Sequence, residues 1–245
     1  MKKFFFGILA LIVSGCAMGP KLQPLPVFNI EKNSRIGIIN FIPPNPKHIH
    51  IGTTVFNNFK KEYQVDWNIP GFINGETRRQ AARLGYKTVI IKPDETLKAQ
   101  LTDRTLVKEN RTVLNPSVSP LLSQLTEQYG INLLFIFEPA EGGVVLHNVV
   151  RVEGHGLGTR SVLGMGYGKA FAMFDADAVC LKPLSPTRGA LCLKDSPIPG
   201  FKVFGNMGKI SKEDKDKAGA VIKNFIMEWI SDLMKQSNLD ARSKR

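Results

Sequence analysis

The sequence lacks the features that most directly assign a biochemical activity. No serine lies in a Gly-x-Ser-x-Gly or Ser-x-x-Lys motif, and the chain carries no nucleic-acid-binding motif, internal repeat or low-complexity block. Acidic residues are scarce, with 21 Asp and Glu against 33 Lys and Arg. After the first residues, no apolar run is long enough to cross a bilayer. We therefore expect a non-enzymatic, basic body whose neighbours are anionic.

The first sixteen residues indicate where the protein resides. Lys2 and Lys3 precede an apolar run from Phe4 to Val13, which suits a secretory signal and is too short for a stable membrane span. The ending Val13-Ser14-Gly15-Cys16 resembles the lipobox of bacterial lipoproteins. That resemblance implies acylation of Cys16 as the new amino terminus. It also implies outer-membrane retention, because Ala17 stands where an aspartate would signal the inner membrane.

The remaining two cysteines are expected to form a disulfide. An even pair in an exported chain, where thiols seldom stay reduced, favours a bond between Cys180 and Cys192. The apolar runs 174–181 and 190–193 flank the turn formers Pro183, Ser185, Pro186 and Gly189, which predicts a hairpin centred on Pro186. Free buried thiols and a redox pair remain as alternatives.

The order of the expected elements predicts an α+β fold. It has a mixed sheet of about five to seven strands, two or three packed helices, the disulfide-stapled hairpin and a long C-terminal helix. The domain expectations are a signal peptide at 1–15, a lipidated extended tether at 16–34, a single periplasmic domain at 35–237 and a basic tail at 238–245. Predicted buried strands are 35–42, 86–91 and 131–137, with further strands at 144–152 and 169–181. Helices are expected at 72–84, near 95–101, at 119–129 and at 211–234.

This element order also resembles known envelope proteins. With 86–91 and 130–136 as core strands, it looks like the amino-terminal domain of TolB. It is similar in layout to the curli-secretion lipoprotein and to lipoprotein activators of cell-wall synthases. A hairpin expected at 48–69 departs from that layout. The resemblance implies a protein that assembles or regulates envelope machinery and is not an enzyme.

A glycine-rich run is the main candidate for a binding surface. Gly154-His155-Gly156-Leu157-Gly158 and Gly164-Met165-Gly166-Tyr167-Gly168 lie between expected strands, which excludes the strand–glycines–helix order of a dinucleotide site. We expect a flexible strand-connecting loop that binds a partner. The residues assigned to this loop are Arg151, Leu157, Arg160, Met165, Tyr167 and Lys169.

Two further sets of side chains are candidate chemical sites. His48 and His50 share a strand face and could bind zinc or copper with His147 or His155, although solvated histidines at a hairpin are the commoner case. Asp175 and Asp177 could form a hydrolase carboxylate pair with Glu138 or Glu153, against a solvated strand face.

We therefore expect an outer-membrane lipoprotein facing the periplasm, without cofactor or nucleic acid. It would bind membrane lipid through Cys16 and also an envelope protein, a second copy or the cell wall. An envelope hydrolase and a metal-binding lipoprotein are the alternatives.

Overall fold

The computed structural model describes residues 21–146, 149–162, 165–201 and 210–240. Cys16, the leader, His147 and most of the expected basic tail lie outside these ranges, as does the side chain of Met165. Among the helices that the described residues form, none is long and apolar enough to cross a bilayer.

Three parallel strands form one side of the sheet, close to where the sequence predicts them. β1 (Arg35–Asn40) lies between β4 (Lys87–Ile90) and β7 (Leu133–Pro139). β1 is buried along almost its whole length because helices cover both of its faces, which explains its continuous apolar sequence.

Long antiparallel strands extend this sheet to one side. β10 (Met165–Leu181) pairs with β9 (Val149–Val162) along one half and with β7 along the other, while β11 (Leu184–Pro197) follows its opposite edge. The described strands give the order β3-β2-β9-β10-β7-β1-β4, with β11 beside β10 and β8 beside β9. The bounds of the remaining strands are β2 Lys47–Ile51, β3 Phe59–Glu62, β8 Glu141–Val145, and a separate hairpin of β5 Thr105–Lys108 and β6 Arg111–Leu114.

Four α-helices occur among the described residues, and their ends follow local sequence signals. They are α2 (Ile69–Arg83), α3 (Glu95–Leu101), α4 (Ser119–Tyr129) and α5 (Lys212–Gln236), with two short 3₁₀ helices at Val55–Asn57 and Pro116–Val118. α4 ends at Gly130, whose φ of 62° is the left-handed cap position. α5 begins with the predicted Ser211 cap, whose hydroxyl accepts a hydrogen bond from the Asp214 amide at 3.0 Å.

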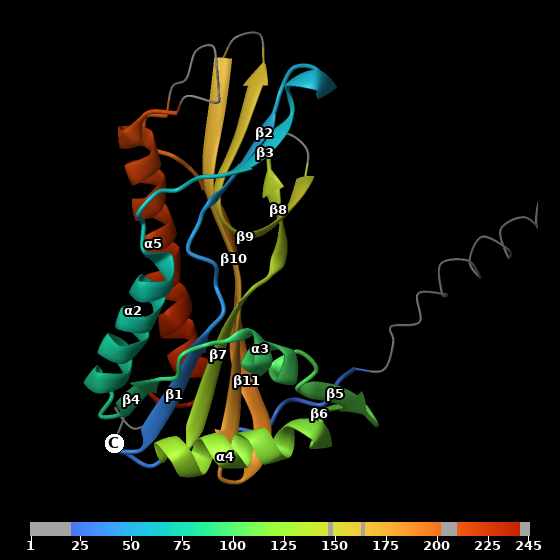
Figure 1. Ribbon diagram of the computed structural model, residues 1–245, viewed down its shortest axis with the longest axis vertical. Helices are drawn as coiled ribbons and strands as arrows, with labels where there is room; N and C mark the ends of the chain where they lie inside the picture. Colours follow the sequence, from blue (N-terminus) through green and yellow to red (C-terminus); the bar gives the residue numbers. More distant parts are fainter. Residues whose placement is uncertain (1–20, 147–148, 163–164, 202–209, 241–245) are drawn as a thin grey trace, which may run out of the picture.

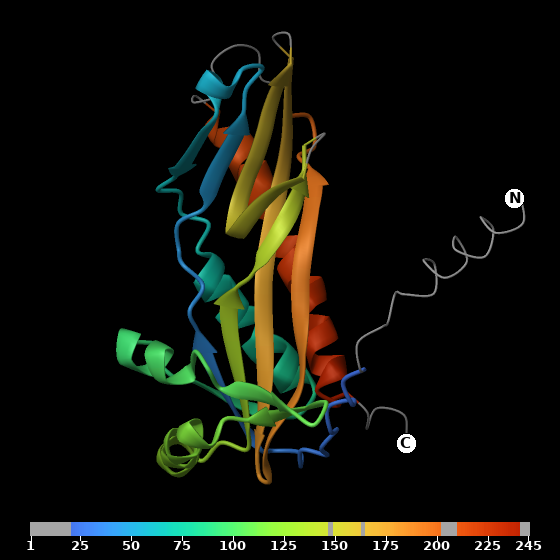
Figure 2. The ribbon, with the colours of Figure 1, turned by 90° about the vertical axis from the view of Figure 1, so that its right-hand side faces the viewer.

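The molecule is elongated, and its two ends differ in layering (Figure 1). At the end that holds α4, the β10–β11 turn and the β5–β6 hairpin, called the α4 end here, α2 and α5 cover one sheet face and α3 and α4 the other. At the opposite end, formed by the β2–β3 hairpin and the β9–β10 tip and called the ribbon end, α5 covers one face. A small cluster that includes Ile49, Val144 and Phe171 covers the other. Figure 2 shows β9, β10 and β11 running along the long axis.

The expected free tether is shorter than predicted. Residues 21–30 run along the α4 end (Figure 2), and the Gln23 amide donates to the Asn110 carbonyl at 2.7 Å. The Pro26 carbonyl accepts from the Thr187 hydroxyl at 3.1 Å, and the Ile30 side chain is buried. The chain is thus held against the domain from Gln23 onward.

The predicted disulfide is wrong. Cys180 and Cys192 are free and buried: Cys180 lies opposite Ser185, and Cys192 lies opposite Phe174. The two thiols are therefore six residues apart along the ribbon, roughly 20 Å at strand spacing, and a disulfide needs Cα atoms within about 7 Å. The hairpin turns between Leu181 and Leu184, and Pro186 lies inside β11. A proline is tolerated in β11 because β11 is an edge strand. Pro186 therefore does not mark the turn, and the predicted centre of the hairpin is wrong.

The fold class is confirmed in its coarse form, a mixed α+β fold with a long C-terminal helix. Among the described residues the sheet has nine strands, above the expected five to seven, and the helices are three packed helices and the long C-terminal helix, as expected. The expected strand at 144–152 is part of two strands, β8 and β9, that form a hairpin. The β5–β6 hairpin was not predicted.

Candidate functional site

The glycine-rich run is a β-ribbon, so the prediction that it forms a flexible strand-connecting loop is wrong, while its binding of a partner stays a prediction. Gly154, Gly156 and Gly158 lie within β9, and Gly166 and Gly168 lie within β10. A Cβ on Gly156 would collide with the Lys47 carbonyl oxygen, and the φ of Gly156 is 154°. Glycine is needed there because β2 lies against β9 at this point.

The six residues assigned to the expected loop do not form one surface. Leu157 is buried against the core beneath α5, and Arg160 donates through Nη1 to the Leu146 carbonyl at 2.7 Å. Lys169 pairs with Asp195 at 2.6 Å, and Arg151 lies on the β8–β9 hairpin. Tyr167 is exposed, at 45%, and lines with Lys169 and Phe201 a cleft of about 370 Å³. Of the five residues whose side chains the structure describes, Tyr167 and Lys169 lie together at an open cleft.

His48 and His50 are buried, so the expectation of solvated histidines is wrong. His48 Nδ1 lies 2.5 Å from the Tyr63 hydroxyl, and His48 Nε2 lies 2.6 Å from Thr159 Oγ1. His50 Nδ1 contacts the same Thr159 oxygen at 2.9 Å. Burial, with His50 and the nearby lysines Lys215 and Lys61, lowers the pKa of His48 to about 3. Both nitrogens of His48 are occupied by hydroxyl groups, which leaves it no free lone pair for a metal.

His155 lies deeper in the same half of the molecule. Its ring packs between Trp67 and Phe174, and neither ring nitrogen has a hydrogen-bond partner. Burial, followed by the charge of Lys47, lowers the pKa of His155 to about 4. Three of the four histidines are therefore neutral and buried beneath α5. Across the described residues, no three His, Cys, Asp or Glu side chains gather in an arrangement that could hold a metal ion.

The carboxylates considered for hydrolysis are organised by an arginine that the sequence did not single out. Arg104, between α3 and β5, donates through Nε to Asp177 at 2.6 Å and through Nη2 to Glu138 at 2.8 Å. Asp175 lies opposite Glu138 on the neighbouring strand, and burial, then Asp177, raises its pKa. Glu153 pairs with Lys47 elsewhere. Two of the three clustered carboxylates are thus held by Arg104.

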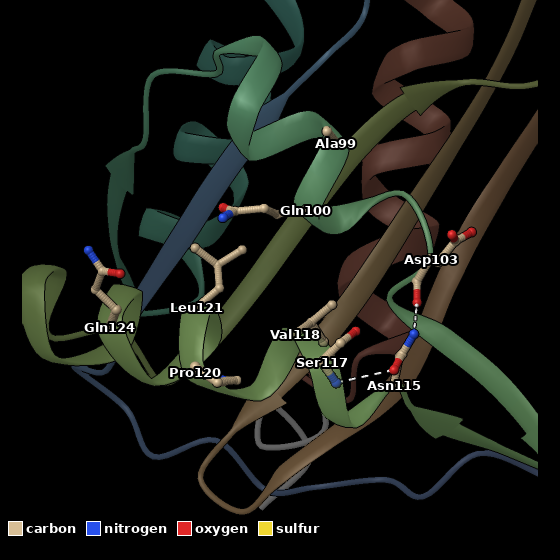
Figure 3. A pocket seen from close by; sticks show the side chains of 9 residues that line it. All are labelled: Ala99, Gln100, Asp103, Asn115, Ser117, Val118, Pro120, Leu121 and Gln124. Carbon is tan, nitrogen blue, oxygen red and sulfur yellow. Dashed lines mark hydrogen bonds between the residues drawn. The ribbon is translucent and has the colours of Figure 1, made fainter.

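A polar cleft of about 450 Å³ opens between α3 and α4 at the α4 end (Figure 3). The Gln100 and Gln124 amides flank Leu121, and Asn115 Nδ2 donates to the Asp103 carbonyl at 3.0 Å. Asn115 Oδ1 also accepts from the Ser117 amide, which fixes the turn before α4. The lining holds hydrogen-bonding groups and one carboxylate, with no histidine, cysteine or lysine. Its chemistry suits weak polar binding and offers no nucleophile–base pair.

Comparisons with known proteins give distant structural similarity alone. No protein-family model matches the chain, and no curated protein matches it in sequence. The hypothetical protein CT253 from Chlamydia trachomatis is similar at 7% identity, covering 87% of this chain and 100% of that one, with a TM-score of 0.43. Lipoprotein GNA1162 from Neisseria meningitidis has 8% identity, coverages of 80% and 99%, and a TM-score of 0.31. A neuraminyllactose-binding hemagglutinin homolog from Helicobacter pylori has 10% identity, coverages of 92% and 94%, and a TM-score of 0.29.

Proposed function

We propose that this chain is a bacterial outer-membrane lipoprotein that binds or scaffolds an envelope partner without catalysing a reaction. The observation that carries the proposal is the lipobox-like Val13–Cys16, joined by a few residues to one end of an elongated domain. Because Gln23 is fixed at the α4 end, acylation of Cys16 would place that end next to the membrane. β10 alone has 17 residues, about 55 Å of strand, so the ribbon end would face the periplasm.

The ribbon end has the chemistry of a partner surface. Phe56, in the 3₁₀ helix between β2 and β3, is 93% exposed, and Tyr167, opposite Arg160 in the β9–β10 pair, is 45% exposed, so both stand at this end. Lys60 and Lys61, on the β3 strand that follows Phe56, are also exposed. Exposed aromatics with lysines suit a partner that offers carboxylates, either an acidic envelope protein or the cell wall.

Two observations support a role without catalysis. Arg104 forms ion pairs with Asp177 and Glu138, the carboxylates that a hydrolase would need free. His48 has both ring nitrogens engaged by hydroxyl groups, and His155 is fully buried in an apolar setting. General acid–base work requires a titratable group within reach of a substrate, which these histidines are not.

Replacement of the acylated cysteine tests the anchor. Cys16→Ala should move the protein from the membrane fraction to the soluble or unprocessed pool, and intact mass should show the loss of the acyl chains. Cys180→Ala is the matched control, because it removes a buried thiol and should leave the protein in the membrane fraction. An unchanged distribution and mass for Cys16→Ala would refute the lipoprotein proposal.

Site-specific crosslinking in cells tests the partner surface. Photo-crosslinkers at Phe56 and Tyr167 should give the same envelope component, while a crosslinker at Met227, exposed on α5, should not. Equal crosslinking from all three positions would contradict a binding surface at the ribbon end.

A further inference from the structure

The β5–β6 hairpin exposes apolar side chains to solvent. All four residues of β5 are exposed, including Leu106 at 36% and Val107 at 62%. The hairpin forms a two-stranded sheet of its own, and such a ribbon gains little stability in water alone. Its turn, between Lys108 and Arg111, places two cations beside Val107.

The amino-terminal segment fixes this hairpin close to the lipid attachment point. The Gln23 amide donates to Asn110 in the hairpin turn at 2.7 Å, and Arg111 Nε donates to Gln23 Oε1 at 2.5 Å. Gln23 stands seven positions after Cys16, a span of at most about 25 Å when fully extended. The part of the hairpin turn that contacts Gln23 therefore cannot lie much farther than that from the backbone of an acylated cysteine.

The chain segment beside the hairpin also exposes apolar and cationic side chains. Leu22 is 54% exposed, Val27 is 52% exposed, and Lys21 is exposed at the first described position. Figure 2 shows this segment passing beside the hairpin at the α4 end. Apolar side chains interspersed with cations suit a surface made of acyl chains and anionic headgroups.

We propose that the β5–β6 hairpin, together with residues 21–27, is a membrane-docking face that lies on the anionic phospholipid surface to which the chain is anchored. This rests on the proposed acylation of Cys16. Val107, the more exposed of the two apolar residues of β5, enters the boundary between headgroups and acyl chains, and Lys108 and Lys21 contact lipid phosphates. The lipid anchor and the docked hairpin are two contacts, which set the orientation of the domain and direct the ribbon end away from the bilayer.

Tryptophan placed at either end of the full-length protein tests this face. Val107→Trp reports on the hairpin, and Phe56→Trp is the matched control at the ribbon end; the native Trp67 and Trp229 are buried. Each variant is reconstituted into vesicles of phosphatidylethanolamine with phosphatidylglycerol that contain a doxyl-labelled lipid quencher. We expect the Val107→Trp signal to be quenched by the lipid label and protected from aqueous iodide, and the Phe56→Trp signal to behave in the opposite way.

Three outcomes separate the proposals. If the indole of the Val107→Trp variant is as open to iodide as that of the Phe56→Trp variant, or is shielded from both quenchers by a protein contact, the docking face is refuted. If intact mass shows that the reconstituted protein is unacylated, the proposed anchor fails, independently of the quenching result. In the Val107→Trp background, Lys108→Gln should reduce the ratio of docked to undocked protein about fivefold on anionic vesicles and little on zwitterionic ones. An equal effect on both would contradict the assigned role of charge.

Discussion

The two halves of this molecule share strands and one helix but are stabilised differently. At the α4 end the sheet is covered on both faces by helices, and β7 presents Phe135, Ile136 and Phe137 as fully buried side chains. At the ribbon end the face beneath α5 carries His48, His50 and His155, where the α4 end carries leucine, isoleucine and phenylalanine. One half is a close-packed apolar core, and the other buries neutral polar rings.

This difference predicts that the stability of the two halves depends differently on pH. Apolar burial at the α4 end does not depend on protonation, so that half should tolerate a broad pH range. The ribbon end depends on histidines that must stay neutral, with Lys47, Lys61 and Lys215 nearby to oppose their charging. The ribbon end is therefore the half that acid should loosen first.

The largest expected effect is a core truncation in the α4 half. Phe135→Ala removes a fully buried ring that packs near Phe137 in the central strand β7, and should lower the free energy of unfolding by about 4 kcal/mol. Met173→Ala, in the smaller cluster of the ribbon half, should cost about 2 kcal/mol. Denaturant unfolding measures both, and exposed Met227→Ala should change stability by less than about 0.5 kcal/mol.

Amide hydrogen exchange shows which half of the molecule each of these two substitutions destabilises. Phe135→Ala should reduce protection throughout the sheet, because β7 connects β1 to β10. Met173→Ala should reduce protection mainly in β8, β9 and the part of β10 that pairs with β9. Equal loss in both halves for Met173→Ala would show that the halves unfold as one unit.

The next effect is the acid sensitivity of the ribbon half. The pKa of His155 is lowered to about 4 in the folded protein, against an ordinary value of 6.5. Between these two pH values the unfolded chain binds more protons than the folded protein. The stability that depends on a neutral His155 is therefore fully present above pH 6.5 and is lost as the pH falls toward 4. Because of this one histidine, the free energy of unfolding should be about 2 kcal/mol lower at pH 5 than at pH 7.

His155→Leu isolates that contribution. The substitution removes two buried nitrogens without hydrogen-bond partners and should make unfolding free energy less dependent on pH by about 2 kcal/mol over that range. His48→Leu is a poorer probe because it also breaks the contacts with Tyr63 and Thr159. An unchanged pH profile in His155→Leu would show that the acid response arises elsewhere.

The local elements were predictable where one signal dominates. Ser211 begins α5, Gly130 ends α4, and the strands β1, β4 and β7 follow from apolar runs. The predicted burial holds for β1 and β7, whereas β4 is an edge strand and is partly exposed. The sequence did not predict the glycine-rich part of the β9–β10 ribbon, because glycine usually indicates a loop. Here it permits close backbone contact, as at Gly156 against Lys47. The Arg104 cluster and the His48–Thr159 contacts join residues 73 and 111 positions apart, for which local spacing gives no signal.

The smallest expected effect tests the corrected cysteine assignment. Cys180 and Cys192 are both buried and lie opposite Ser185 and Phe174, so a reductant has no bond to break. The melting temperature should therefore be the same with and without dithiothreitol. Burial raises the pKa of Cys192 to about 12, which keeps this thiol protonated and slow to react. A thiol reagent should modify the two cysteines only after unfolding in denaturant. A reagent count of zero after unfolding without reductant, together with a mass two hydrogens lower, would establish the disulfide and require β10 and β11 to pair in a different register.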